Sequence, residues 1–281
     1  MLTIRASKQP SDTELGQIRA LCQRAEAHDK VFPLNEEAQL SPNCGRHILV
    51  STTGLVGYAW LGSDHSAQIV VDPLWRRQQV ATSLLIQLRT LDPEVELWSF
   101  GDLPSAREFC HTAGFATQRE LLVMQATLNS APSPIPVPGV RLEEFSLKYL
   151  DELVGLNARV FAGHPEQGQL TIRDFQARMA SDWFDPNDLL MALDKGDVMI
   201  GFIWAKVESS DAELYVLGVD PLQASRGVGR LLLQTGLANL FAQSVDNVRL
   251  WVEADNFAAR SLYEITGFSI VRRDFRYRST P

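Results

Sequence analysis

The chain has 281 residues, of which 26 are Lys or Arg and 34 are Asp or Glu, so its formal net charge is −8. That acidic balance argues against a nucleic-acid binder, because neutralising phosphates requires clustered cations. With 45% hydrophobic and 21% charged residues the composition is that of a globular protein, and the length favours two domains.

The sequence gives no indication of a membrane protein or of a metal-binding protein. No apolar run approaches the roughly 18 residues that a membrane span requires, and the first residues lack the apolar stretch of a signal peptide. The cysteines Cys22, Cys44 and Cys110 are odd in number and lie far apart, without the spacing of metal ligands. We therefore expect a reduced, cytoplasmic protein that needs no metal.

A proline-rich segment at 129–139 divides the chain into near-equal halves. Prolines occupy every second position from Pro132 to Pro138, which removes backbone donors and favours an extended, semi-rigid segment. The sequence therefore predicts an N-terminal domain at 1–128, a linker at 129–139 and a C-terminal domain at 140–281.

The two halves repeat one another. The repeated blocks, each given with its second copy, are 57–60 and 201–204, 71–74 and 219–222, and 98–115 and 251–268. Three matching blocks in one order, with small length differences between them, are typical of a duplicated domain.

In the second half, apolar β-rich runs alternate with helical stripes. The predicted strands are 140–144, 189–193, 198–206, 213–219, 248–252 and 268–277. The predicted helices are 149–161, 171–179, 257–265, and one after Pro221 with an apolar stripe at Leu233, Leu237, Leu240 and Phe241. Gly267 is placed as a helix stop. This order predicts an α+β domain with a central mixed sheet.

The predicted strand 213–219 runs into a turn that contains Gly227 and Gly229, and then into a helix. Glycines at such a turn let the backbone approach a ligand closely, and the first helical N–H groups carry the positive end of the helix dipole. The pattern suits a pyrophosphate, although a tight turn with capping glycines explains a lone Gly-x-Gly equally well.

The turn resembles the motif of the GNAT superfamily of acetyl-CoA-dependent N-acetyltransferases: Arg or Gln, two residues, Gly, any residue, then Gly or Ala. Both glycines match, whereas Ala224 stands at the first position and Gln223 lies one residue early. The segment 256–268 also resembles the asparagine-led helix of that family, which ends in a tyrosine followed by Gly-Phe. The resemblance covers both halves, so it implies two tandem GNAT domains, each a mixed sheet flanked by helices.

Five local runs narrow the resemblance to the mycothiol synthase family of tandem GNAT enzymes. They are 164–168, 183–186, 204–207, 213–221 and 253–256. The resemblance implies that the C-terminal domain transfers acetyl from acetyl-CoA to the cysteinyl amine of cysteinyl-glucosaminyl-inositol, which completes mycothiol. It also implies that the protein is a monomer whose partner is a small molecule, with no nucleic acid or membrane involved.

The acetyl-CoA site implied by the resemblance combines the end of the strand 213–219, the glycine turn and the helix after Asn256. Its residues are Leu217, Gly218, Val219, Ala224, Ser225, Arg226, Gly227, Val228, Gly229, Arg230, Asn256, Ala258, Ala259, Arg260 and Ser261.

Two side chains are candidates for proton transfer. An α-amine, with a pKa of roughly 7.7 to 8.0, needs a base at neutral pH, and Glu213 is the best-placed carboxylate, although position alone also fits a solvated acid. Tyr263 matches the family's acid, since a phenol can donate to the departing sulfur; without the resemblance, a tyrosine at the edge of the core is the better interpretation. The thioester oxygen needs a donor, which backbone N–H groups near Leu217 to Val219 supply if a bulge frees them.

The resemblance assigns the sugar-inositol ligand to Glu36, Glu166, Lys206 and Trp251, together with Glu213. Carboxylates suit this task because hydroxyl groups are donors and the amine is cationic. For Glu36 the alternative is a solvated loop acid, and its neighbour Glu37 leaves the register open.

The first half departs from the pattern at each informative position. Gln79, Ala81, His65, Leu103 and Cys110 stand where the second half has Gly227, Gly229, Glu213, Asn256 and Tyr263. We therefore expect the first domain to be non-catalytic. A second acetyl-CoA site there would use Ile69, Val70, Val71, Arg76 and Arg77, although an exposed basic pair is more often only solvated.

Two other functions stay open at this stage. One is a GNAT enzyme that acts on another amine, such as an aminoglycoside or a peptide N-terminus. The other is a CoA-sensing module without turnover, because a fold does not dictate a function. The sequence offers no nucleophile–base pair, which favours direct acetyl transfer without an acyl-enzyme.

Overall fold

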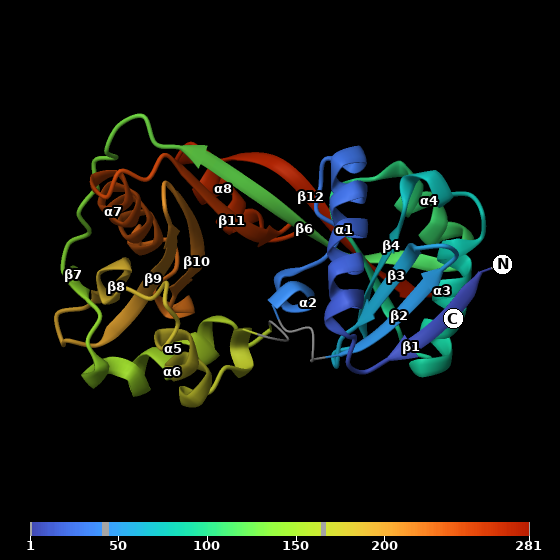
Figure 1. Ribbon diagram of the computed structural model, residues 1–281. Helices are drawn as coiled ribbons and strands as arrows, with labels where there is room; N and C mark the ends of the chain where they lie inside the picture. Colours follow the sequence, from blue (N-terminus) through green and yellow to red (C-terminus); the bar gives the residue numbers. More distant parts are fainter. Residues whose placement is uncertain (1, 41–44, 164–166, 281) are drawn as a thin grey trace. The chain divides into compact units, whose positions relative to one another are not determined.

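The computed structural model of the chain describes residues 2–40, 45–163 and 167–280, which form two compact units (Figure 1). Unit 1 consists of Met1–Leu122, Glu253–Asp255 and Arg272–Pro281. Unit 2 consists of Val123–Val252 and Asn256–Val271. Each unit therefore holds residues from both halves of the sequence.

Two long strands account for this exchange. Strand β6 (Phe115–Thr127) begins in unit 1 and ends in unit 2, and strand β12 (Ser269–Ser279) runs the other way. In unit 1, β12 pairs in antiparallel fashion with β5 (Glu96–Ser99), where Phe275 lies opposite Ser99. The division at the proline-rich segment stays a prediction, to which the structure adds that the last strand of the second half completes the sheet of unit 1.

Unit 1 takes most of its elements from the first half. In chain order they are β1 (Thr3–Ser7), α1 (Asp12–Asp29), α2 (Glu36–Leu40), β2 (Arg46–Ser51), β3 (Leu55–Leu61), β4 (Ser66–Val71), the 3-10 helix η1 (Pro73–Trp75), α3 (Val80–Leu91), β5 and α4 (Pro104–Thr112). The strand order is β1-β2-β3-β4-β5-β12-β6. Every residue of β3 is buried, because α3 covers one face of the sheet and α1 covers the other.

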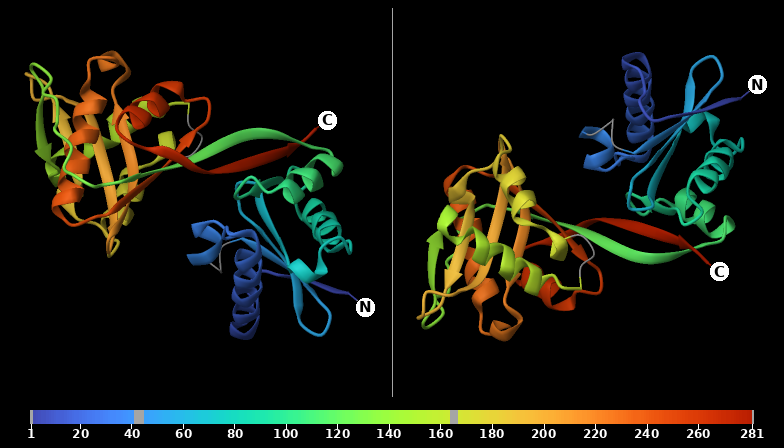
Figure 2. Two further views of the ribbon diagram at one scale, coloured as in Figure 1. Left: turned by 90° about the horizontal axis from the view of Figure 1, so that it is seen from above. Right: turned by 90° about the horizontal axis from the view of Figure 1, so that it is seen from below.

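Unit 2 repeats this plan with elements from the second half. In chain order they are β7 (Arg141–Glu144), η2 (Leu147–Tyr149), α5 (Leu150–Val160), η3 (Gln167–Gln169), α6 (Ile172–Met179), η4 (Pro186–Asp188), β8 (Leu189–Leu193), β9 (Met199–Glu208), β10 (Asp211–Val219), η5 (Pro221–Gln223), α7 (Val228–Ala242), β11 (Asn247–Glu253) and α8 (Phe257–Ile265). The strand order is β6-β11-β10-β9-β8-β7, and Figure 2 shows the helices on both faces of these strands. The α+β fold with a mixed sheet is thus confirmed, as is the order of elements that the sequence predicts for the second half.

The repeated Gly-aromatic block has a structural cause that both units share. A Cβ atom at Gly57 in β3 would lie 2.5 Å from Val80 Cγ1, at the start of α3. A Cβ atom at Gly201 in β9 would lie 3.0 Å from Leu232 Cδ1 of α7. Glycine in the strand therefore lets the helix pack directly against it, which holds the start of that helix over the sheet.

The repeated Val-Asp-Pro-Leu block is likewise the same local structure twice. Asp72 and Asp220 each accept a hydrogen bond from the backbone N–H two residues later, at 3.0 Å and 2.9 Å, and so cap the 3-10 helix that follows. Each aspartate also accepts from an arginine on a helix, Arg24 at 2.7 Å and Arg159 at 3.3 Å. The chain leaves the sheet in the same direction in both units because these contacts fix the same turn.

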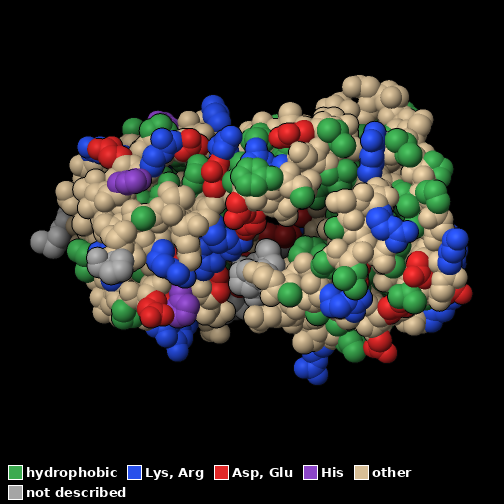
Figure 3. Space-filling view, turned by 180° about the vertical axis from the view of Figure 1, so that it is seen from behind, with side chains coloured by type: hydrophobic (Ala, Val, Ile, Leu, Met, Phe, Trp, Pro, Cys, Tyr) green, Lys and Arg blue, Asp and Glu red, His purple; other side chains and the backbone are tan. Residues whose placement is uncertain are grey.

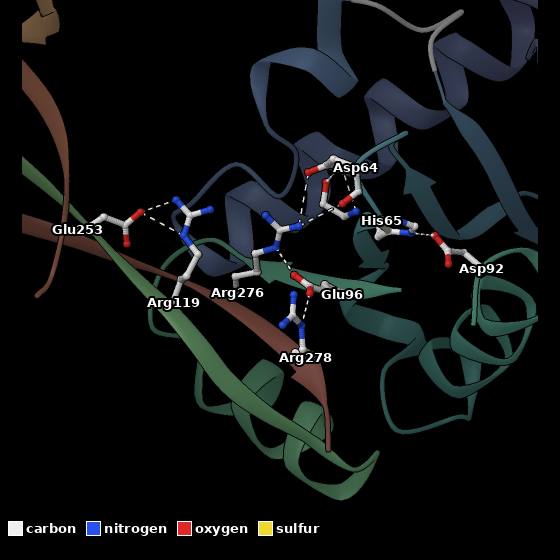
Figure 4. A network of polar contacts seen from close by, with 9 residues as sticks. Asp64, His65, Asp92, Glu96, Arg119, Glu253, Arg276 and Arg278 are labelled. Atoms are coloured by element: carbon white, nitrogen blue, oxygen red, sulfur yellow. Dashed lines mark hydrogen bonds and ion pairs between the residues drawn. The ribbon is translucent and has the colours of Figure 1, made fainter. Parts of the chain in front are cut away.

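The end of the exchanged strand β12 is held in unit 1 by charged side chains (Figure 4). The carboxylate of Glu96, whose side chain is only 5% exposed, contacts both Arg276 and Arg278 of β12. The guanidinium of Arg119 on β6 contacts the carboxylate of Glu253, the last residue of β11. A buried carboxylate needs such partners, because an unpaired charge in the interior is costly.

The surface and the helices add two plain observations. Acidic and basic side chains are interspersed over the face seen in Figure 3. Across the described ranges, no helix combines the length and the apolar character that crossing a membrane requires.

Candidate active site and cofactor cleft

The candidate active site of unit 2 begins where two parallel strands separate. Strand β10 pairs with β11 at Asp211, Ala212 and Glu213, and the parallel register recorded for the described residues ends there. Glu213 therefore lies at the point where β10 leaves β11, and the edge of β10 beyond it is open to a ligand. Strands that splay in this way leave backbone groups without a ladder partner, so a polar extended ligand can lie against them.

Lys206 lies directly opposite Glu213. The two residues are register partners across the antiparallel strands β9 and β10, which puts a cation and a carboxylate side by side. Lys206 Nζ also lies 3.1 Å from a carboxylate oxygen of Glu208 and 5.7 Å from the ring centre of Trp183. The structure thus brings together two of the residues that the sequence assigns to substrate.

The glycine turn after β10 has the backbone shape of an anion site. Ser225 and Gly227 both have positive φ, at 63° and 88°, and Gly227 is the N-cap of α7. A glycine cap has no side chain to accept the first helical N–H groups, so these donors face outward with the positive end of the helix dipole. The residues Ala224 to Arg230 therefore form a cradle that suits a phosphate group.

Three elements meet at this cradle. A Cβ atom at Gly229 would lie 3.4 Å from Leu262 Cδ2 of α8 and 3.5 Å from Val219 Cγ2 of β10. The strand end, the turn and helix α8 are thus neighbours, as an acetyl-CoA site would require. The proline-rich segment also reaches the turn, since Val137 Cγ2 lies 3.4 Å from the Cβ position of Gly227 and the Ile135 N–H donates to Gln234 of α7 at 3.1 Å.

Asn256 begins helix α8 and caps it. Its Oδ1 accepts a hydrogen bond from the Ala259 N–H at 3.2 Å, which satisfies one of the free donors at the helix start. Arg260 lies with its guanidinium carbon 5.6 Å from the ring centre of Phe257, an aromatic side chain that is 71% exposed. Asn256 therefore has a structural task, whatever it contributes to a cofactor.

Tyr263 is buried, with 7% of its surface exposed, and its ring packs against Phe268 at 5.8 Å. Burial raises the pKa of the Tyr263 phenol to about 12, so the group stays protonated at neutral pH. A protonated phenol can donate a hydrogen bond, but its raised pKa opposes complete transfer of the proton.

Two of the remaining residues that the sequence assigns to substrate are in the described part of the chain. Trp251 on β11 is 40% exposed. Glu36 is an exposed first residue of α2 in unit 1, and Glu37 beside it is exposed as well. Glu166 lies outside the described residues.

The sequence analysis names backbone N–H groups near Leu217 to Val219 as donors if a bulge frees them, whereas the bulge of β10 lies nearer to Glu213. The pairing with β9 is regular there, whereas the register shifts between Leu214 and Val216, so Tyr215 is the extra residue. Tyr215 lies two positions after Glu213, and its ring centre is 5.5 Å from that of Trp204 and 5.5 Å from that of Trp183. Sequence periodicity carries no signal for these contacts, which join residues far apart in the chain.

Unit 1 holds a cavity at the position equivalent to the cofactor groove. Its strands β4 and β5 pair in parallel from Ser66 to Gln68 and then separate, and a cavity of about 510 Å³ lies beyond that point. The cavity is lined by all five residues that the sequence names for a second cofactor site, Ile69, Val70, Val71, Arg76 and Arg77. Both arginines are already paired, Arg76 with Asp29 at 2.6 Å and Arg77 with Glu108 at 3.1 Å.

The catalytic positions of unit 1 hold different chemistry. The sequence comparison pairs His65 with Glu213, but the strand registers place Ser66 there: Ser66 lies opposite Glu96 as Glu213 lies opposite Arg249, because the bulge residue Tyr215 has no counterpart in β4. His65, one residue earlier, is bonded to Asp92 at 2.7 Å, and this contact raises the pKa of its imidazole. Cys110 lies at the position of Tyr263, and burial raises the pKa of its thiol to about 12. Neither group is a free base at neutral pH, because the thiol is protonated and the imidazole is already bonded to a carboxylate.

No metal site emerges from the described residues, where His, Cys, Asp and Glu form no group of three or more that could hold an ion.

Known proteins resemble the chain in sequence and fold. Residues 152–268 match the Acetyltransferase (GNAT) family. Mycothiol acetyltransferase of Clavibacter michiganensis subsp. michiganensis is 40% identical over 97% of this chain and 94% of its own. The enzyme of that name from Propionibacterium freudenreichii subsp. shermanii is 38% identical over 98% and 90%.

Solved structures confirm the fold. A GCN5-related N-acetyltransferase from Sphaerobacter thermophilus has a TM-score of 0.79 at 20% identity and covers 99% of this chain and 95% of its own. A tandem GNAT protein from the clavulanic acid biosynthesis pathway has a TM-score of 0.74 at 16% identity and covers 100% and 99%. Full-length relatives at this level of identity settle the family: the chain belongs to the mycothiol acetyltransferases, which are tandem GNAT enzymes.

Proposed function

We propose that unit 2 transfers the acetyl group of acetyl-CoA to the cysteinyl amine of 1D-myo-inositol 2-(L-cysteinylamino)-2-deoxy-glucopyranoside, the last step of mycothiol biosynthesis. One observation carries the proposal: Glu213 lies where β10 leaves β11, on the strand that runs into the glycine cradle. A ligand held by the cradle along the open edge of β10 would end beside this carboxylate. The substrate identity rests on the relatives named mycothiol acetyltransferase.

Glu213 acts as the base in this proposal. The substrate amine, with an ordinary pKa of roughly 7.7 to 8.0, is mostly an ammonium at neutral pH and cannot attack a carbonyl carbon. Glu213 takes its proton, while Lys206 on the neighbouring strand and Trp251 on β11 hold the sugar-inositol part together with Glu36 and Glu166. Acetyl-CoA supplies the activated carbonyl.

The other groups of unit 2 hold and polarise the reacting atoms. The turn Ala224–Arg230 and the start of α8, including Ala258 and Ser261, hold the pyrophosphate and the pantetheine arm. Tyr263 donates a hydrogen bond to the leaving sulfur. Because a thiol ordinarily titrates near 8.5, a phenol with a pKa of about 12 stabilises the developing thiolate better as a donor than as a proton source.

Unit 1 is proposed as a non-catalytic partner that can hold a second acetyl-CoA in its cavity of about 510 Å³. Its lining is largely apolar, as a pantetheine arm requires, but a pyrophosphate at the turn would have to separate Arg76 from Asp29. We expect this site to bind more weakly than that of unit 2. We also propose that the protein works as a monomer in the cytoplasm, where the buried thiols of Cys22 and Cys110 stay reduced.

The test is an assay of the purified full chain with acetyl-CoA and cysteinyl-glucosaminyl-inositol, beside aminoglycosides and peptide N-termini at equal concentration. The proposal expects turnover with the mycothiol precursor to exceed the others by at least about tenfold. Turnover of another amine instead would leave acetyl transfer and refute the substrate. Binding of acetyl-CoA without any turnover would indicate a sensing module.

A further inference from the structure

We propose that Arg178 is a positioning residue for acetyl transfer: it acts through Tyr215 to hold the bulge of β10 that separates Glu213 from the cofactor groove. The inference rests on the proposed function and adds to it a residue of helix α6 that sequence analysis did not single out.

The bulge is the part of the strand that most needs support. An extra residue in one strand interrupts the ladder and leaves a backbone N–H without its usual partner. Tyr215 is that residue in β10, two positions after Glu213. A free N–H at this place can donate to an oxygen of a ligand on the open edge of the strand, provided that the bulge keeps one conformation.

Arg178 supplies a directional contact to this residue. Its Nε donates a hydrogen bond to the Tyr215 hydroxyl at 2.7 Å, and its Nη1 donates to the Asp174 carbonyl at 3.1 Å. The guanidinium thus joins the last turn of α6 to the bulge. Hydrogen bonds from a charged donor are roughly twice as strong as those between neutral groups, which suits a contact that fixes direction.

Helix α6 is itself well anchored, so it can serve as a support. Thr171 and Asp174 form a capping box at its start. Phe175 is fully buried in the core of unit 2, and its ring stacks with that of Trp204 at 6.1 Å. Arg178 lies one turn after Phe175 on the same side of the helix, and therefore starts from a fixed position.

Packing against the neighbouring rings fixes the position of the Tyr215 ring but not the direction of its hydroxyl group. Trp204 and Trp183 contact the ring, and in the described part of the chain the indole N–H of Trp204 has no hydrogen-bond partner. Aromatic packing of this kind tolerates rotation more readily than a hydrogen bond does. Trp183 also lies beside Lys206, so a shift of the cluster would reach the cation opposite Glu213.

The test compares Arg178→Met with Arg173→Met, which removes an exposed arginine from the same helix. For Arg178→Met we expect kcat to fall roughly 10- to 100-fold, as a small misplacement of reacting groups does. The dissociation constant of acetyl-CoA should stay unchanged, because the cradle is intact. Arg173→Met should match the wild type in both. An unchanged kcat in Arg178→Met would overturn the inference.

Three further variants separate positioning from general damage. Tyr215→Phe keeps the ring and removes the acceptor, so its kcat should fall in the same way. The double variant should be no slower than the slower single one, because both changes remove one contact. Arg178→Lys keeps a charged donor without the planar fork and should recover part of the rate. Additive losses in the double variant would contradict a shared contact.

A measurement without substrate keeps the inference distinct from the proposed function. Amide hydrogen exchange of residues 214–217 in the free protein should accelerate at least about tenfold in Arg178→Met but not in Arg173→Met. If the wild type fails to acetylate the mycothiol precursor, the proposed function falls, and this exchange decides alone whether Arg178 holds the bulge. Equal exchange in both variants would show that it does not.

Discussion

The turns that follow β4 and β10 have the same backbone conformation but different side chains around them. In unit 1, Arg77 and Gln79 have φ of 61° and 63°; in unit 2, Ser225 and Gly227 have 63° and 88°. Gln79 brings a side chain to the position where unit 2 has a glycine, yet it adopts the same left-handed conformation, which costs a non-glycine residue roughly 1 to 2 kcal/mol. The shape of the turn is thus set by the packing of helix and strand, while the chemistry depends on the side chains around it.

The side chains around the turns, and those at the positions of base and acid, differ between the two units. In unit 1 the arginines at the turn are paired with carboxylates, and the positions of base and acid hold Ser66 and Cys110. In unit 2 the corresponding turn contains a glycine cap, and Glu213 lies opposite a lysine. A duplicated fold can therefore keep a binding shape in both copies while only one keeps groups suited to proton transfer.

The largest expected effect comes from Glu213. In Glu213→Gln, kcat should fall about 10²- to 10⁴-fold, the usual contribution of a general base. The loss should be greatest at neutral and lower pH, where the amine is protonated, and should shrink as pH rises above the ordinary amine pKa of about 8. Steady-state rates across pH measure this effect.

The control variants for that prediction are Glu144→Gln, an exposed strand carboxylate of unit 2, and His65→Gln, which changes the ionisable residue of unit 1 next to Ser66, the register equivalent of Glu213. Both should keep wild-type turnover. A comparable loss in His65→Gln would place catalysis in the other unit.

The next effect concerns stability and contrasts the two exchanged strands. Glu96→Ala leaves Arg276, whose side chain is 10% exposed, without its buried carboxylate, and should destabilise unit 1 by about 3 kcal/mol. In unit 2 the corresponding contact is between Arg249 and Gln125, a 2.8 Å bond near the surface, so Arg249→Met should cost less than about 1 kcal/mol. Denaturant unfolding of both variants measures the difference, and equal losses would mean that the buried pair is not the stronger tie.

A smaller effect is expected from exchanging the residues at the two turns. Gly227→Val introduces a β-branched side chain at positive φ and against Val137, so acetyl-CoA binding should weaken about tenfold. Gln79→Gly relieves backbone strain in unit 1 but raises the conformational entropy of the unfolded chain. The free energy of unfolding should therefore change by less than about 1 kcal/mol. Calorimetry and thermal unfolding check both. If Gln79→Gly reduced turnover as strongly as Gly227→Val, the contrast between the units would fail.

The smallest effect is the titration of His65. Its pKa is raised, chiefly by the hydrogen bond that the imidazole donates to the Asp92 carboxylate, so the contact stabilises the folded protein below the ordinary imidazole pKa of about 6.5. That contribution disappears as pH rises through the raised value. An NMR titration should show a raised pKa that Asp92→Asn lowers, and no such change should affect turnover.

Local patterns predicted much of the fold. The strands and helices of the second half follow from periods of two and 3.6 residues and from glycine and proline at their ends, since these depend on neighbouring residues. The exchange of β6 and β12 did not follow, because a strand carries no local mark of which sheet it joins. A 13-residue strand at Phe115–Thr127 was long enough to reach a second sheet, but length alone does not choose the partner.

The candidate site divides in a similar way. The glycine cradle and Glu213 follow from a motif that is continuous in sequence, and the structure places them on one strand and its following turn. The bulge at Tyr215, the support from Arg178 and the contact of Val137 with the turn depend on residues far apart in the chain. Such contacts are decided by packing, which no spacing rule expresses.

The pairing of β12 with β5 sets a condition on how the protein is made. Residues 272–279 follow every other strand of unit 1 in the chain and are synthesised after them, yet they lie inside the sheet of that unit. Until these residues are synthesised, the carboxylate of Glu96 and the edge of β5 that pairs with β12 remain exposed to water. The first half of the chain therefore completes its sheet only after the second half has been synthesised, and loss of residues 272–279 would harm the unit that is built mainly from the first half.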